Sequence, residues 1–374
     1  MRYLLMGLTI GVIICCQNSG KQDNKREKHW SLIKSGELKL PLDSTSGFMT
    51  FCMQPYSYND KEYLYFNNFK TGVINVYDLN LRAIVEKIKF EKEGPDNVGT
   101  SPWAFYVHNK DSIFVLSHMD NQLSLIDKEG NLLDKHYINT DYWNGEPIPW
   151  ASTDMPMRFD NKNKILFIPG VVRVPKEGYS AEHALIVYNV ITNDFSYSIP
   201  YPKLYDAGFW VEDNYTRGYT TPNLENEELI YGFGVDHMIH SQRGESYSAK
   251  SNFLGDFKPV FKKYQATWDD NISHKQLVLS GAYSSLISDN FNKVYYRVVN
   301  LPVSEENYEK GIWNGGYSII IIDENFQVRG EIVLEDGLRG YMIFLDKNGL
   351  NIANEHAYKM NEDSISFAKF KLVR

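Results

Sequence analysis

Short apolar and aromatic runs recur along this chain, separated by turns rich in Asn, Asp, Gly and Pro. In the clearest unit, residues 62–66, 73–78 and 84–90 form three such runs. The same order of runs returns at 112–138, 164–199 and 293–334, and in a degenerate form at 228–253. Runs of about four to eight residues at regular spacing predict the strands of a sandwich, barrel or propeller.

One further short run precedes each unit. These runs lie at 48–51, 103–106, 155–159, 217–221, 283–287 and 341–344. Four strands per unit is the pattern of a propeller blade, so we predict an all-β fold, a six-bladed β-propeller. A seventh blade is the alternative if residues 241–281 hide another unit, and a pair of packed sheets is the less favoured architecture.

The last unit is incomplete, because residues 349–351 and 364–372 supply its middle strands and the chain then ends. Residues 37–40 can supply the missing outer strand, which would close the ring with an N-terminal strand and remove a free sheet edge. Insertions lengthen several blades, at 141–154, 170–182, 200–215 and 301–316. Helical patterns are scarce, and residues 257–268 are one of the few candidates for a short helix.

The N-terminus has the pattern of an export signal. A basic start, Met1-Arg2, precedes an apolar run at 3–14. This run is shorter than the about 20 residues that cross a bilayer, but it matches the apolar region of a signal peptide. Cys16, preceded by Ile13, Ile14 and Cys15, resembles the lipidated residue of a bacterial lipobox. The alternative is an ordinary signal peptide with chance cysteines.

We therefore predict three parts. Residues 1–15 form a lipoprotein signal peptide, residues 16–35 carry the lipidated Cys16 and a flexible polar tether, and residues 36–374 form one propeller domain. Similarity to Gram-negative lipoproteins implies an outer-membrane, lipid-anchored protein of the cell envelope. Whether it faces the periplasm or the cell surface stays open.

Composition narrows the choice of partner. The chain has 374 residues and a formal charge of -8, which disfavours nucleic acid because a polyanion needs a basic surface. Its 26 Tyr, 20 Phe and 7 Trp favour strands. Three cysteines are too few for a disulfide framework or a zinc cluster, and Cys52 reads as a buried apolar side chain.

Aromatic loops supply the candidate binding residues. The CH faces of a sugar ring stack on flat aromatic rings, while carboxylates and amides bond its hydroxyl groups. Loops with this composition contain Trp143, Glu146, Trp150, Trp210, Asp213 and Trp313. Arg217 could bind a carboxylate ligand or pair with an internal Asp, and the same alternatives hold for Arg297. The competing interpretation is that the tryptophans cover blade tops or fill gaps between blades.

Signals for catalysis are weak. The chain has no nucleophile elbow, phosphate-binding loop or dinucleotide fingerprint, so we predict no cofactor. His237 and His240 would point to opposite faces of a strand, which disfavours a shared metal. Glycoside hydrolysis needs two carboxylates about 5–10 Å apart. Glu146, Asp154, Glu212 and Asp213 are candidates that the sequence cannot place.

The lipobox, the blade pattern and the segment at 288–297 together resemble lipoproteins of the Bacteroidetes type. These belong to a family with a domain of unknown function and a six-bladed, TolB-like propeller. The resemblance covers nearly the whole mature chain and implies the fold and the envelope location. It implies no catalytic residues.

These observations predict a membrane-anchored, non-catalytic propeller that binds a glycan, a peptide or an envelope protein. The alternative is a propeller hydrolase or lyase that acts on polysaccharide. A third hypothesis is a scaffold for an outer-membrane complex, which would require a broad exposed apolar face.

Overall fold

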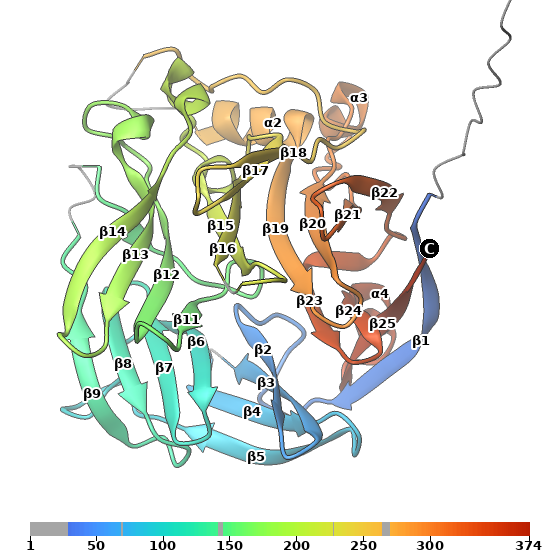
Figure 1. Ribbon diagram of the computed structural model, residues 1–374. Helices are drawn as coiled ribbons and strands as arrows, with labels where there is room; N and C mark the ends of the chain where they lie inside the picture. The colour runs from blue at the N-terminus through green and yellow to red at the C-terminus, as the bar shows by residue number, and fades with distance from the viewer. Residues whose placement is uncertain (1–28, 69, 141–144, 227, 264–269) are drawn as a thin grey trace, which may run out of the picture.

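The computed structural model describes residues 29–68, 70–140, 145–226, 228–263 and 270–374. Their strands form six antiparallel sheets arranged around a common centre (Figure 1). The inner strands β2, β6, β15, β19 and β23 and the inner part of the third sheet lie closest to that centre, and β2 contacts β23 to complete the ring. The prediction of a six-bladed propeller is confirmed, and the described part of 241–281 adds no seventh blade.

Each blade runs outwards from its inner strand. The first two blades are β2 (Met53–Tyr58), β3 (Lys61–Asn68), β4 (Val73–Asp78) and β5 (Ala83–Lys89), then β6 (Pro102–Asn109), β7 (Ser112–Ser117), β8 (Gln122–Ile126) and β9 (Leu132–Tyr137). The third is β10 (Ile148–Pro149) and β11 (Arg158–Asp160), both paired with β12 (Ile165–Val171), then β13 (His183–Asn189) and β14 (Asp194–Pro200). The fourth is β15 (Gly218–Pro222), β16 (Leu229–Phe233), β17 (Met238–Ser241) and β18 (Ser246–Ser248). The fifth is β19 (Ala282–Asp289), β20 (Val294–Asn300), β21 (Tyr317–Asp323) and β22 (Val328–Val333).

The sixth blade joins the two ends of the chain. It contains β23 (Leu338–Asp346), β24 (Gly349–Asn354), β25 (Ser364–Val373) and, on the outside, β1 (Ser31–Pro41). In the antiparallel pair of β1 and β25, Glu37 lies opposite Ala368 and Leu40 opposite Ile365. The predicted closure of the ring by residues 37–40 is therefore confirmed, and β1 covers the edge that β25 would otherwise expose.

The pattern of buried and exposed side chains along a strand depends on the position of that strand in its blade. The middle strand β21 is buried at every position, because neighbouring blades cover both of its faces. The outer strand β5 exposes most of its side chains. Strand ends carry the turn residue that the sequence predicts: the Asp78 carboxylate accepts hydrogen bonds from the backbone N–H groups of Asn80 and Leu81, both at 2.9 Å.

All the described helices lie on one face of the ring. In a four-stranded meander, the connection from the second strand to the third and the connection to the next blade leave from the same edge. The described helices all fall in such connections: α1 (Asp213–Thr216), α2 (Asp270–Ser280), α3 (Glu305–Glu309), α4 (Glu355–Met360), η2 (Tyr179–Ala181) and η3 (Lys203–Ala207). We call this side the helical face. The predicted insertions also fall in these connections.

Two local predictions need correction. Residues 48–51 precede the first inner strand, which begins at Met53. The described part of 257–268 is not helical, because Phe261 pairs with the backbone of Phe209 and Pro259 disfavours a helix interior. The longest helix in the described part of the chain is α2, which covers Asp270–Ser280.

Arg297 has an internal role. Its guanidinium is fully buried between the fourth and fifth blades, 3.4 Å from the centre of the Tyr283 ring. It donates hydrogen bonds to the carbonyl oxygens of Asp236 at 2.5 Å and Ala249 at 3.0 Å, and to the Tyr219 hydroxyl at 3.1 Å. Arg297 therefore ties two blades together, and it does so through backbone carbonyl oxygens and a tyrosine hydroxyl rather than through the carboxylate of an internal Asp.

The N-terminal predictions, including Cys16, lie outside the described residues. Among the residues that the structure does describe, no helix has the length and apolar character needed to cross a bilayer.

Candidate functional site

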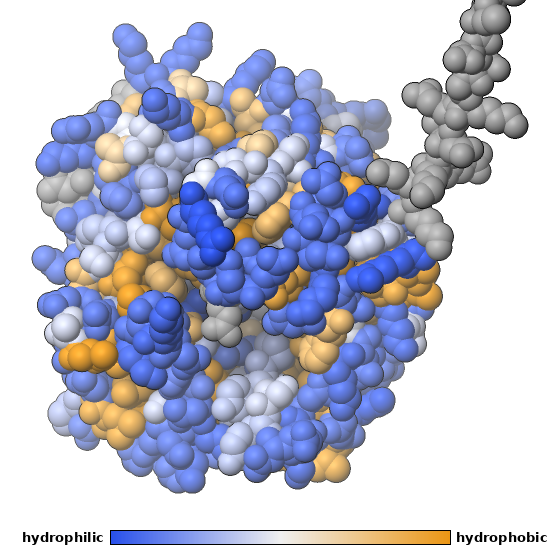
Figure 2. Space-filling model, in the orientation of Figure 1, coloured by the Kyte–Doolittle hydropathy of each residue, from blue (hydrophilic) through white to orange (hydrophobic). Residues whose placement is uncertain are grey.

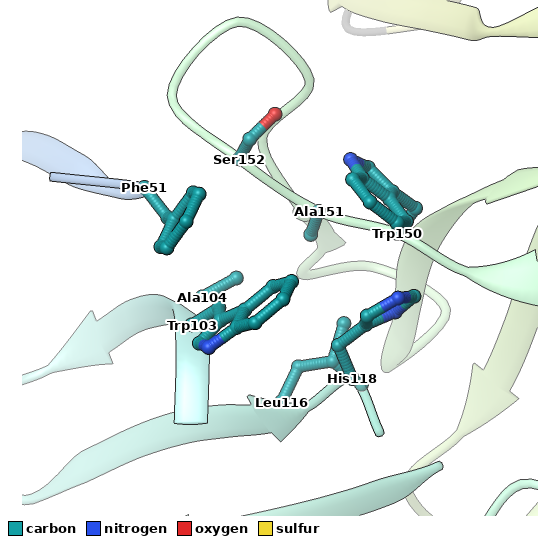
Figure 3. A pocket seen from close by; sticks show the side chains of 8 residues that line it. All are labelled: Phe51, Trp103, Ala104, Leu116, His118, Trp150, Ala151 and Ser152. Atoms are coloured by element: carbon teal, nitrogen blue, oxygen red, sulfur yellow. The ribbon is translucent and has the colours of Figure 1, made fainter. Parts of the chain in front are cut away.

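Four aromatic rings meet on the helical face and form what we call the aromatic stack: Phe51, Trp103, His118 and Trp150. The rings of Phe51 and Trp103 stack at 4.7 Å between centroids, and those of Trp103 and His118 at 5.2 Å. Trp150 meets His118 edge-on at 4.2 Å. Figure 3 shows the Trp103 ring between Phe51 and His118. The four side chains come from the first three blades, so the site requires these neighbouring blades to pack against one another.

The elements of the fold place these rings together. Phe51 lies just before β2, Trp103 near the start of β6, His118 directly after β7 and Trp150 directly after β10. All four positions lie at the helical-face ends of strands near the centre. The rings border a small hollow of about 20 Å³, which has room for about one water molecule. A larger ligand would therefore rest on the half-buried rings rather than sink into a deep cavity.

His118 adds a polar atom to the stack. Its Nδ1 lies 2.8 Å from the carbonyl oxygen of Pro149. Because a carbonyl only accepts, Nδ1 must carry the hydrogen. Burial lowers the pKa of His118, so the ring is neutral at pH 7 and its Nε2 is a hydrogen-bond acceptor. The stack therefore combines apolar ring faces with an acceptor that a hydroxyl group could use.

A loop at residues 150–157, which we call the hub loop, connects the stack to the centre of the ring. The backbone N–H of Thr153 donates to the carbonyl oxygen of Phe51, and the Thr153 hydroxyl accepts from the N–H of Met53, both at 2.9 Å. Met155 is fully buried in the apolar cluster that includes Tyr219 of β15 and Leu286 of β19. The hub loop thus starts in the third blade, bonds to the first and packs with the fourth and fifth.

Asp154 of the hub loop and Arg217 form the charged part of the site. The Asp154 carboxylate accepts a hydrogen bond from the Ser152 hydroxyl at 2.5 Å and lies 3.5 Å from Nη1 of Arg217. Only 9% of the Asp154 side chain and 16% of the Arg217 side chain are exposed. The Arg217 guanidinium lies 5.9 Å from the centre of the Trp150 ring. A buried ion pair therefore borders the aromatic stack.

The charge of Asp154 reaches the sixth blade. Burial raises the pKa of Tyr341, and the negative charge of Asp154 adds to this increase while Arg339 opposes it. Arg339 itself pairs with Glu355 of α4.

Asp213 belongs to a second ion pair on this face. Its two carboxylate oxygens accept from Nε and Nη2 of Arg173 at 2.5 and 2.6 Å, a two-pronged arrangement. The negative charge of Asp213 raises the pKa of His118, and the positive charge of Arg173 lowers it. Asp213 therefore lies near the stack, with its carboxylate already engaged.

The other predicted binding residues lie elsewhere. Trp210 is 1% exposed, and its indole N–H donates to the carbonyl oxygen of Tyr205 at 3.0 Å, so it fills the core as the competing interpretation held. Trp313 is 60% exposed and meets His274 of α2 edge-on at 5.9 Å, away from the stack. Glu146 lies near Tyr197 of the outer strand β14. Burial raises the pKa of Tyr197 to about 12, and the negative charge of Glu146 adds to this increase. Trp143 lies outside the described residues.

The structure therefore brings together Trp150 and Arg217 from the predicted set, with Asp213 close by. It adds Phe51, Trp103 and His118, which the sequence analysis placed in or near strands without assigning them a role. Phe51 and Trp103 could have been found from their position in the repeat. Both lie at the start of an inner strand, and the inner strands start at the same end of the ring.

The two histidines considered as metal ligands bond to protein groups. His240 Nε2 lies 2.8 Å from an oxygen of Asp236, and His237 Nδ1 lies 2.7 Å from the Tyr283 hydroxyl. Within the described ranges, no three His, Cys, Asp or Glu side chains are grouped as metal ligands would be.

Comparison with known proteins agrees with this architecture. The profile of a family described as Domain of unknown function (DUF4221) matches residues 30–333. A crystal structure of a DUF4221 member from Bacteroides vulgatus superposes with a TM-score of 0.77 at 21% identity, covering 93% of this chain and 99% of that one. A Bacteroides fragilis protein gives 0.54 at 12% identity, with 92% and 96% covered. None of the curated proteins matches the chain. The chain therefore belongs to the DUF4221 family, whose domain has no assigned function, and it has the fold of a six-bladed β-propeller.

Proposed function

We propose that this protein is a lipid-anchored, non-catalytic propeller of the outer membrane that binds a saccharide on the aromatic stack. The observation that carries the proposal is the position of Trp103 and Trp150 beside the Asp154–Arg217 pair. Flat rings can hold the apolar face of a sugar, and a few fixed polar groups beside them can orient its hydroxyl groups. A peptide or an envelope protein is the alternative partner.

The path of the chain determines the side of the ring from which an anchor at Cys16 would extend. Strand β25 follows α4 and so runs away from the helical face. Ser31, the first residue of β1, lies opposite Val373 at the far end of β25. The segment that leads to Cys16 therefore joins the ring on the side opposite the aromatic stack. An anchored protein would present the stack away from its membrane.

One side of the molecule favours a small ligand over a scaffold role. On the side shown in Figure 2, hydrophobic residues form separate patches among hydrophilic ones. A scaffold would be expected to show a broad apolar face.

A polysaccharide hydrolase or lyase is the second candidate. The neutral ring of His118 favours it, because an unprotonated Nε2 can act as a general base. Binding is preferred since the nearby carboxylates are held in ion pairs, Asp154 with Arg217 and Asp213 with Arg173. Incubation of the protein with a bound polysaccharide, followed by measurement of its chain length, separates the two: a binder leaves the chains intact.

The binding test is calorimetric titration of the full chain, purified in detergent, with a panel of oligosaccharides. Trp150→Ala should weaken binding about tenfold, because it removes a stacking surface worth about 1 kcal/mol or more. Trp103→Ala should also weaken binding, because the Trp103 ring lies between Phe51 and His118 and holds the stack in place. Trp313→Ala is the matched control, as it removes an exposed tryptophan from the same face but outside the stack. Equal binding by the Trp150→Ala and Trp313→Ala variants would refute the proposal, and so would a panel in which no saccharide binds.

A further inference from the structure

The three arginines on the helical face differ in how well they are paired. Arg173 holds both oxygens of Asp213 at 2.5 and 2.6 Å, and Arg339 pairs closely with Glu355. Arg217 instead reaches Asp154 only at 3.5 Å, beyond the usual hydrogen-bond range of about 2.7–3.2 Å. Arg217 is thus the least satisfied guanidinium of the three.

One further donor of Arg217 also lacks a partner. Within the described ranges, the Arg217 Nε is buried without a hydrogen bond, and so is the hydroxyl of the preceding residue, Thr216. A buried guanidinium normally has its donors satisfied, because removing charge from water is unfavourable unless other groups replace the water. The Arg217 side chain is 16% exposed, so part of its guanidinium can still reach an acceptor from outside the chain.

The position of Arg217 defines which acceptor fits. The guanidinium lies beside the Trp150 ring, at 5.9 Å from its centre. A sugar ring stacked on Trp150 would present the group at its edge to Arg217. A planar carboxylate at that edge matches the two-pronged geometry of a guanidinium, whereas a neutral hydroxymethyl group supplies at most one hydrogen bond and no charge.

We propose that Arg217 binds the carboxylate of the ligand, so that the site selects acidic sugars, the uronic acids, over their neutral counterparts. This inference rests on the proposed saccharide binding at the aromatic stack. Asp154 acts as the positioning residue: it holds Arg217 from one side and is itself fixed by Ser152. Binding of the carboxylate would give the exposed part of Arg217 a charged acceptor.

The test compares trigalacturonic acid with the neutral galactose trimer of the same linkage, titrated into the full chain in detergent. We expect the acidic trimer to bind about tenfold more tightly or better, since hydrogen bonds to charged groups are stronger than neutral ones. The preference should shrink as salt concentration rises. Arg217→Gln should abolish the preference, because it removes the positive charge that the carboxylate of the acidic trimer would bind.

Two variants guard against a trivial loss of folding. Asp154→Asn combined with Arg217→Gln leaves no unpaired charge and should show the same loss of preference, with thermal unfolding checked for each protein. Arg243→Gln removes an exposed arginine paired with Glu228 and should keep the preference.

The outcomes separate the two claims. Equal binding of both trimers by the parent protein, or a preference that survives in Arg217→Gln, overturns the role of Arg217 while saccharide binding stands. Failure of both trimers and of every other oligosaccharide to bind overturns both claims.

Discussion

Removal of one buried side chain from β1 should weaken the closure of the ring. Leu40 is 0% exposed and packs in the apolar cluster shared by the first and sixth blades, while its neighbour Lys39 points to solvent. Leu40→Ala should cost about 2–5 kcal/mol of unfolding free energy, the usual range for a buried leucine. Lys39→Ala should cost less than about 0.5 kcal/mol.

The expected change in melting temperature follows from the size of the ring. An unfolding entropy of about 2.1 cal/mol/K per residue, over about 340 residues between β1 and β25, gives about 0.7 kcal/mol/K. Leu40→Ala should therefore lower the melting temperature by about 3–7 °C if the ring unfolds as one unit. Calorimetry and urea denaturation measure both quantities. Equal stability of the two variants would show that β1 does not close the ring as described.

Three further predictions concern single buried groups. Trp210→Ala should destabilise the fold by about 3–5 kcal/mol, because the side chain is buried and its N–H is bonded; unaltered urea denaturation would contradict its place in the core. Burial raises the pKa of the Cys52 thiol to about 12, so alkylation at pH 8, followed by mass spectrometry of the Cys52 peptide, should be negligible until the protein unfolds. Burial lowers the pKa of His118, so protonation opposes folding: the stability present above about pH 6.5 should fall as the pH drops towards the folded-state pKa. A His118→Gln variant should lack that part of the pH dependence of the melting temperature. Identical pH profiles for the variant and the parent protein would contradict this assignment to His118.

The blade architecture could be predicted because its signals are local. Apolar runs, turn residues such as Asp78 and the missing outer strand of the last unit are all visible in short segments, and the pairing of β1 with β25 confirmed the count. The start of β2 was misplaced because it depends on a distant contact, the bonds of Thr153 to Phe51 and Met53. In the described part of 257–268 the expected helix is absent for a similar reason, the backbone pairing of Phe209 with Phe261.

The candidate site was predicted only in part, because it is assembled from separate blades. Trp150 and Arg217 stood out by their loop composition and lie at the site. Trp210 gave the same local signal, yet it packs inside, since a buried partner for its N–H cannot be seen in the sequence. Trp103 and His118 gave no loop signal. They lie at the adjoining ends of β6 and β7 in the second blade, and Trp150 of the third blade packs against His118.

The central claim is that a saccharide rests on the aromatic stack, and fluorine NMR of protein labelled with 5-fluorotryptophan tests it most directly. The chain has 7 Trp, and their signals can be assigned by replacing each with Phe. Addition of a bound oligosaccharide should shift the signals of Trp103 and Trp150 and leave those of Trp210 and Trp313 in place. Shifts confined to Trp313, or binding without any change at Trp103 and Trp150, would contradict the account.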